Sequence, residues 1–117
     1  MSEPPPLDSW YGQGPSEFSR LRARGAVIGG VNHLFRREYF VAYSSFQRAA
    51  VGVDPSEARR IRGLAHAAAA GVKLALGDSR GAARQLKRAR SRLAEGPPTV
   101  AEVDVDAVLA QLEREVE

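Results

Sequence analysis

The stretch DPSEARRIRGLAHAAAAGVKLA, residues 54–75, decides the fold of this chain. Asp54 is a residue type that caps helix amino termini, and Pro55 suits the first helical turn because its missing N–H would have no partner there. Glu57 stands three residues after Asp54, at the position from which a carboxylate reaches back to the cap residue. The pattern predicts that a helix begins here.

The same helix is expected to be apolar around most of its circumference. At 100° per residue two adjacent faces are apolar, made up of Ile61, Leu64, Ala65, Ala68, Val72 and Ala75 on one and Gly63, Ala67, Ala70 and Leu74 on the other. The polar residues fall on one narrow strip, which consists of Arg59, Arg62, His66 and Lys73. Such a helix is buried by its neighbours, and its small residues let their backbones approach closely.

Two helices are predicted before this central one. Ser16 can cap the first, in which Phe18, Leu21, Ile28, Val31, Asn32 and Phe35 recur at spacings of three and four. Glycines between residues 25 and 30 weaken its middle and leave room for a break. The second runs from about Arg37 to Ala50 and carries one stripe, formed by Tyr39, Ala42, Tyr43, Phe46 and Ala50.

Two more helices are predicted after it. Gly77 ends the central helix and Asp78 or Ser79 starts the next, whose inward side chains are Ala82, Leu86, Ala89 and Leu93. Gly96-Pro97-Pro98 stops that helix. Asp104 then caps a short acidic helix whose apolar side consists of Val105, Val108, Leu109 and Leu112. No alternating stretch is long enough to predict a sheet.

These segments predict an all-α fold, a single-domain bundle of about five helices over residues 16–117 with the Ala/Gly-rich helix buried at its centre. A chain of 117 residues is long enough to bury one core. Residues 1–15 are rich in proline and glycine and have no helical period, so we expect an amino-terminal tail. Its aromatic pair, Trp10 and Tyr11, either clips this tail onto the bundle or lies in a disordered segment.

Composition excludes several classes of protein. Hydrophobic residues make up 44% of the chain and charged residues 26%, which is typical of globular domains. No apolar run approaches the roughly 20 residues that span a bilayer, and the acidic, proline-rich start does not resemble a signal peptide. The chain has no cysteine, which excludes disulfides, thiolate metal sites and cysteine nucleophiles. We therefore expect a cytoplasmic protein without a membrane partner.

The net charge of +3 hides a strong segregation of charge. Residues 18–92 hold 16 of the 17 Lys and Arg residues against four acids, whereas residues 93–117 hold seven acids against one arginine. Residues 1–17 hold three acids and no base. A basic body flanked by acidic ends indicates either a nucleic-acid surface or ends that fold back and neutralise the body.

Three passages within residues 32–93 and their borders resemble the bacterial and archaeal family known as domain of unknown function 309. The first is Val31-Asn32 followed by the run 38–42 (EYFVA), the second is the run 60–64 (RIRGL) with its alanine-rich continuation, and the third is Gly77-Asp78 followed by Arg80-Gly81-Ala82. The carboxy-terminal run 103–106 (VDVD) also matches. The resemblance implies a small all-α bundle with one inner helix surrounded by others.

The chain departs from that family at the family's polar residues. Where relatives carry a histidine, two glutamates and a tryptophan after the acidic-aromatic run, this chain has Tyr43, Ser44, Gln47 and Ala50 among the corresponding positions. Arg62 and His66 replace two core-helix glutamines. The family's role is unassigned, so the resemblance implies a fold and no activity.

No catalytic or metal-binding constellation is predicted. His33 and His66 are the only histidines, and no histidine or acid stands three or four residues from His66, so a zinc or iron site lacks ligands. Asp54 and Asp78 are better explained as helix caps than as an acid–base pair. We expect no catalytic residues, no metal and no cofactor.

Two groups of residues are the candidate sites. One is a pocket beside the second and central helices, lined by Tyr39, Tyr43, Gln47, Arg62 and His66. The other is a basic face for nucleic acid or an acidic partner, formed by Arg80, Arg84, Lys87, Arg88 and Arg92. The acidic carboxy-terminal helix is a competing partner for these cations, and Arg90 lies close enough to the core edge to pair with a carboxylate.

The leading hypothesis is a non-enzymatic helical protein-interaction module that binds a protein partner or self-associates. It rests on the absence of a recognisable catalytic or metal-binding constellation and on apolar residues expected at the surface, such as Trp10, Tyr11 and Phe40. The alternatives are nonspecific nucleic-acid binding through residues 80–92 and a degenerate small-molecule pocket, left from a former enzyme, beside Tyr43 and His66.

Overall fold

The computed structural model describes residues 17–96, 99–100 and 103–116 and is all-α, with five helices within those residues. They are α2 (Glu17–Phe35), α3 (Tyr39–Ala49), α4 (Pro55–Ala75), α5 (Ser79–Leu93) and α6 (Val105–Val116). The predicted tail with Trp10 and Tyr11 lies outside the described residues. No helix of the described part is both long and apolar enough to cross a membrane.

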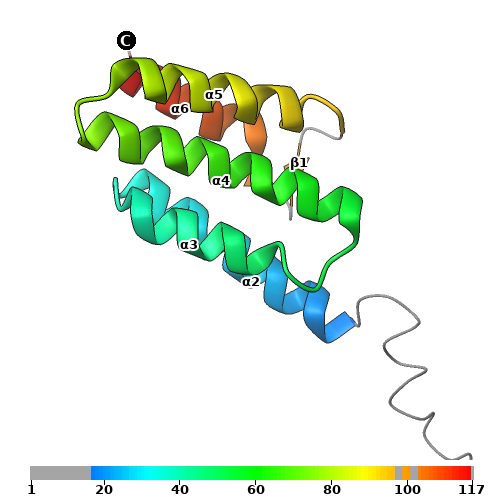
Figure 1. The fold of residues 1–117 in the computed structure, drawn as a ribbon. Coiled ribbons are helices and arrows are strands. Elements are labelled where there is room, and N and C mark those ends of the chain that lie inside the picture. Colours follow the sequence, from blue (N-terminus) through cyan, green and yellow to red (C-terminus); the bar gives the residue numbers. More distant parts are fainter. Residues whose placement is uncertain (1–16, 97–98, 101–102, 117) are drawn as a thin grey trace, which may run out of the picture.

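The first four of these helices run back and forth in chain order. Each packs against the next, so α2 lies on α3, α3 on α4 and α4 on α5 (Figure 1). Helix α6 packs behind α5 and also contacts α4. Helix α4 is therefore the central helix, with α3, α5 and α6 around it, as the sequence predicts.

Burial along α4 follows the predicted pattern except in its last turn. Ile61, Leu64 and Ala68 are buried, together with most of the small residues between them. Val72 is only half-buried and Ala75 is exposed, because α4 extends past the start of α3 and α5 at this end. Asp54 occupies the cap position as predicted, but its side chain accepts no capping hydrogen bond.

Two glycines allow the helices to approach closely. A Cβ atom at Gly71 of α4 would lie 2.2 Å from Tyr39 Cδ1 of α3, and one at Gly30 of α2 would lie 2.6 Å from Phe46 Cε1 of α3. Real Cβ atoms do not make contacts this short, so a larger residue at either position would force the helices apart. The Tyr39 and Phe46 rings of α3 thus pack directly against glycine backbone, Tyr39 on α4 and Phe46 on α2.

The turns between helices use left-handed residues. At the end of α4 Gly77 has φ +78°, and Asp78 N–H donates to the Lys73 carbonyl oxygen over 2.8 Å, which closes a Schellman motif. The end of α2 repeats this motif with Arg37 at φ +63°. Helix α3 therefore begins at Tyr39 rather than at the predicted Arg37.

The apolar stripe predicted for the first helix does not form its buried face. Helix α2 is continuous through its glycines, and its buried residues are Ala23, Val27, Gly30, Val31 and Leu34. Of the predicted stripe only Val31 is buried, while Phe18, Leu21, Ile28 and Phe35 lie on the surface. The reason is that the Phe46 ring requires the small Gly30 opposite it, which turns the larger residues of α2 outward.

The carboxy-terminal half agrees with prediction apart from one short ladder. Asp78 Oδ1 accepts from Gly81 N–H over 2.8 Å at the start of α5, and Asp104 Oδ1 accepts from Ala107 N–H over 3.2 Å at the start of α6. The predicted inward residues of both helices are buried. Strands β1 (Thr99–Val100) and β2 (Val103–Asp104) form a two-residue antiparallel ladder that was not predicted, because two residues are too few to show an alternating pattern.

Candidate functional site

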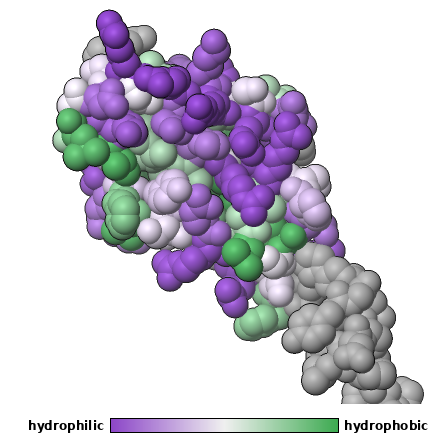
Figure 2. Space-filling model, viewed as in Figure 1, coloured by the Kyte–Doolittle hydropathy of each residue, from purple (hydrophilic) through white to green (hydrophobic). Residues whose placement is uncertain are grey.

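The polar strip of α4 and one side of α5 together line a basic groove. We define the basic groove by ten residues, which are Arg59, Arg62, His66 and Lys73 of α4, Arg84, Gln85, Arg88 and Arg92 of α5, and Tyr43 and Gln47 of α3. The polar strip lines this groove because α3, α5 and α6 pack against the other faces of helix α4. Figure 2 shows hydrophilic side chains gathered over α4 and α5 on this side of the molecule.

Three adjoining hollows make up the groove. The first has a volume of about 180 Å³ and lies between α3, α4 and α5, where Tyr43, Arg62, His66 and Arg92 line it above an alanine floor. The second, of about 160 Å³, lies toward Lys73 and shares Gln85 with the first. The third, of about 350 Å³, lies beside Arg59 and shares Arg92 with the first. Because neighbouring hollows share residues, they form one continuous surface.

Hydrogen bonds hold the polar side chains at the middle of the groove. His66 Nδ1 lies 2.9 Å from Gln85 Oε1, which joins α4 to α5. Gln47 Nε2 donates to the Tyr43 hydroxyl oxygen over 2.9 Å, one turn apart on α3. These contacts fix two amide groups and one phenol next to Arg62 and Arg92.

Carboxylates neutralise the two ends of the groove but not its middle. Arg59 pairs with Glu95 at 3.2 Å at one end, and Lys73 lies 4.0 Å from Asp78 at the other. Among the described residues no carboxylate oxygen lies within 4.0 Å of the charged nitrogens of Arg62, Arg84, Lys87, Arg88 or Arg92. The acidic helix α6 pairs instead through Glu113 with Arg90 and through Glu115 with Arg37. Helix α6 therefore pairs with the basic body, as predicted, but with arginines that lie outside the groove.

The structure combines parts of both predicted sites. Four members of the predicted pocket, Tyr43, Gln47, Arg62 and His66, line the first hollow. Tyr39 does not, because its ring packs against Gly71. From the predicted basic face Arg84, Arg88 and Arg92 line the groove, whereas Arg80 and Lys87 are exposed outside it.

Arg59 and Lys73 belong to the predicted polar strip of α4 but to neither predicted site, and Gln85 is the groove residue for which the sequence gives no signal. It carries no charge and shows no periodic signal of its own. Its place opposite His66 depends on how α4 and α5 are aligned, which the sequence of neither helix specifies. The predicted absence of a metal site remains a prediction; within the residues that the structure describes, no three His, Asp or Glu side chains gather.

A second surface lies on the outer face of α2, which we define as Phe18, Leu21, Gly25, Ile28, Asn32 and Phe35. Phe18 is 74% exposed, Leu21 59%, Phe35 47% and Ile28 41%. A Cβ atom at Gly25 would meet nothing within 4 Å. Burying a large apolar side chain usually stabilises a domain by about 1.5–3 kcal/mol, so the four in water on one helix face form an exposed apolar patch whose burial would be favourable.

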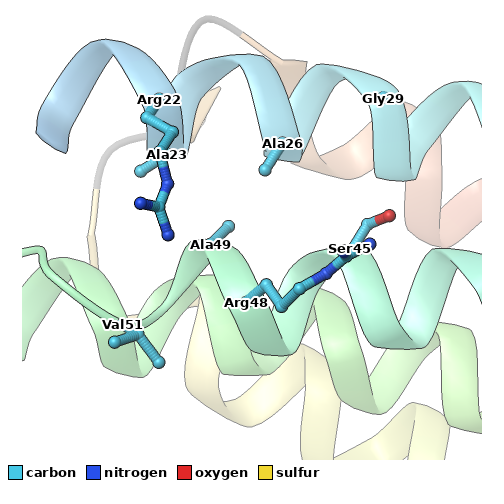
Figure 3. Close-up of a pocket in the computed structure, with 8 residues that line it drawn as sticks. All are labelled: Arg22, Ala23, Ala26, Gly29, Ser45, Arg48, Ala49 and Val51. Atoms are coloured by element: carbon cyan, nitrogen blue, oxygen red, sulfur yellow. The ribbon is translucent and has the colours of Figure 1, made fainter. Parts of the chain in front are cut away.

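A hollow between α2 and α3 borders this outer face. It has a volume of about 420 Å³ and is lined by Arg22, Ala23, Ala26, Gly29, Ser45, Arg48, Ala49 and Val51. Figure 3 shows Arg22 reaching from α2 toward α3 and Ala49 pointing back toward α2. Small side chains on both helices create the hollow, and the two arginines give it a basic character.

Comparison with protein-family models, curated proteins and solved structures yields no match for this chain. The resemblance to the domain of unknown function 309 family therefore stays a prediction that rests on the residues quoted for it.

Proposed function

We propose that this chain is a non-enzymatic helical interaction module that pairs with a second copy of itself through the outer face of α2. The observation that carries the proposal is the row of four large apolar side chains in water, Phe18, Leu21, Ile28 and Phe35. The cytoplasm is its proposed compartment, and membership of the domain of unknown function 309 family is proposed with it.

The spacing of the outer face supports a helix as the partner. Phe18, Leu21, Gly25, Ile28, Asn32 and Phe35 follow one another at intervals of three, four, three, four and three residues. This is the heptad spacing of a coiled coil, with Phe18, Gly25 and Asn32 at a positions and the other three at d positions. The row lasts for the whole length of α2, about 28 Å at 1.5 Å per residue.

Three features favour a second copy, in parallel orientation, as the occupant. Asn32 stands at an a position, where a single asparagine pairs with its counterpart and specifies register in parallel dimers. Glu17 and Arg22 occupy the g and e positions that meet across such a dimer, so opposite charges would flank the first layer. Gly25 would meet Gly25 of the second copy and let the two helices approach.

The exposed area is consistent with this assignment. A phenylalanine side chain can bury about 200 Å². Phe18 is 74% exposed and Phe35 47%, so these two residues in both chains of a dimer offer roughly 480 Å² of area for burial. Stable interfaces begin near 1,200 Å² in total, so Leu21, Ile28 and the flanking residues have to supply the rest. An interface along most of α2 would meet this requirement.

The first test is the molar mass of the full chain by light scattering and sedimentation equilibrium. We expect a dimer that the Leu21→Glu variant converts to a monomer, because a charge would be buried at the interface. The matched control is Leu76→Glu, since Leu76 is 73% exposed and lies after α4. A wild-type chain that stays monomeric, or a Leu21→Glu chain that stays dimeric, would overturn the proposal.

The orientation has its own test because the chain contains no cysteine. In a parallel pair two Gly25→Cys side chains face each other within disulfide range and should cross-link on mild oxidation. Cysteine at Arg20, on another side of α2, is the control and should cross-link much less. Equal cross-linking at both positions would contradict a parallel pairing through the outer face.

A further inference from the structure

We infer that the basic groove binds the sugar-phosphate backbone of single-stranded nucleic acid and takes one base into the hollow beside Tyr43 and His66. The inference does not depend on dimer formation, because the basic groove is formed by α3, α4 and α5 whereas the outer face belongs to α2. It rests on the arrangement of charge, on the length of the groove and on the nature of its middle hollow.

The groove is long and carries cations along its whole length. The strip of α4 from Arg59 to Lys73 covers about 21 Å at 1.5 Å per residue, and Arg84, Arg88 and Arg92 run beside it on α5. An isolated small anion would need one cluster of cations rather than a row. A row of this length matches a chain of phosphates, each of which can bind one or two arginines.

The cations in the middle are available to a ligand. Within the described residues Arg62, Arg84, Arg88 and Arg92 have no carboxylate within 4.0 Å, whereas the end residues Arg59 and Lys73 do. A phosphate that enters the middle therefore displaces water and counterions and does not compete with a protein carboxylate. Release of those counterions favours binding and makes it depend on salt.

The middle hollow favours a single strand over a duplex. The first hollow is lined by the aromatic ring of Tyr43 and the imidazole of His66. The amides of Gln47 and Gln85 lie beside them, and Ala65 and Ala69 form its floor. Aromatic rings bind unstacked bases through their faces, and amides can form hydrogen bonds with base edges. A duplex keeps its bases stacked inside, so it could use the arginines but not this hollow.

The test is fluorescence anisotropy of the full chain with labelled single-stranded RNA and DNA of about 12 nucleotides, a length within the range of known single-strand sites. Between about 50 and 200 mM salt, four phosphate contacts predict a slope of log affinity against log salt of about −2.8. The Arg88→Gln/Arg92→Gln variant should bind more weakly and reduce the magnitude of that slope by about 1.4. The control Arg20→Gln/Arg36→Gln removes the same charge from outside the groove and should leave the slope unchanged.

A second variant separates base stacking from charge. Tyr43→Leu keeps an apolar side chain against the core but removes the ring, so it should weaken binding at least about fivefold without changing the salt slope. The dimer-breaking Leu21→Glu variant should keep its affinity per chain, which distinguishes failure of this inference from failure of the proposed dimer.

Several results would overturn the inference. They are no binding of either strand at the lower salt, affinity that is unchanged in Arg88→Gln/Arg92→Gln, tighter binding of a duplex of equal length, or displacement by heparin as effective as displacement by unlabelled single strands.

Discussion

The aromatic ring of Tyr39 lies directly against the backbone of Gly71, so that a Cβ atom at Gly71 would come within 2.2 Å of Tyr39 Cδ1. This contact fixes the distance between α3 and the central helix α4. It also explains why Tyr39 does not reach the basic groove, although Tyr43, one turn further along α3, does.

We expect Gly71→Ala to lower the free energy of unfolding. Overpacking costs about 1–3 kcal/mol, and the gain in helix propensity of about 1 kcal/mol offsets only part of it, so the net loss should be about 1 kcal/mol. Urea denaturation followed by circular dichroism measures it. Gly29→Ala is the matched control, since nothing lies within 4 Å of its Cβ position and it is not part of the outer face of α2, and it should raise the free energy of unfolding by about 0.5–1 kcal/mol.

An equal gain in stability from both alanine variants would contradict the close approach of α3 and α4. Such a result would mean that the Tyr39 ring moves aside at little cost.

The titration of Tyr39 should differ from that of an exposed tyrosine. Burial raises the pKa of its phenol above the ordinary 10.0, Glu115 raises it further and Arg37 lowers it in part. The folded chain then holds this proton more tightly than the unfolded chain does. The associated stability is complete below pH 10.0 and is lost as the pH rises through the folded-state pKa.

Tyrosinate absorbance and urea denaturation across this pH range test the prediction. The wild type should show a late-ionising tyrosine that is missing from Tyr39→Phe, and its stability should fall more steeply with pH than that of the variant. Identical pH profiles for the two chains would contradict the raised pKa of Tyr39.

Two of the predicted caps, Asp54 and Asp78, should differ in their contribution to stability. Asp78 accepts a hydrogen bond from Gly81 N–H, whereas the Asp54 side chain accepts none. Asp78→Ala should therefore lower the free energy of unfolding by about 1 kcal/mol and Asp54→Ala by less than half of that. Thermal or urea unfolding of both variants measures these changes. A larger loss of unfolding free energy in Asp54→Ala than in Asp78→Ala would contradict the observed capping geometry.

The sequence predicts the central helix well because several signals agree there. The start at Asp54-Pro55, the nearly continuous apolar surface and the stop at Gly77 all specify one helix, and the structure confirms it. The polar strip with Arg62 and His66 could also be read from the sequence, since it follows directly from 100° per residue.

The sequence predicts α2 poorly because this helix has two apolar faces. Periodicity selects the face with the larger side chains, Phe18, Leu21, Ile28 and Phe35, and those are exposed. The buried face holds alanine, valine and glycine, whose contribution is visible only when the Phe46 ring is placed on Gly30. Which of two apolar faces is buried depends on the neighbour, and a single helix does not contain that information.

The sequence predicts the groove as two separate sites for a similar reason. Tyr43 and His66 belong to the predicted pocket beside α3 and α4, and Arg88 and Arg92 belong to the predicted basic face of α5, because the sequence does not show that α5 lies along the same groove. Their union depends on the alignment of α4 against α5, which is marked by the contact between His66 and Gln85. Such an alignment is a property of tertiary packing.

The polar residue in the outer face of α2 leads to a last prediction, which rests on the proposed dimer. Asn32 is exposed and stands at an a position between Ile28 and Phe35. A buried asparagine there lowers affinity but favours a parallel dimer over other assemblies. Asn32→Leu should therefore tighten association and, because the constraint on the number of chains is lost, add trimers or tetramers to the dimer. Sedimentation equilibrium over a range of concentrations measures both effects. Asn32→Leu that associates no more tightly than the wild type would show that this position is not buried between two chains.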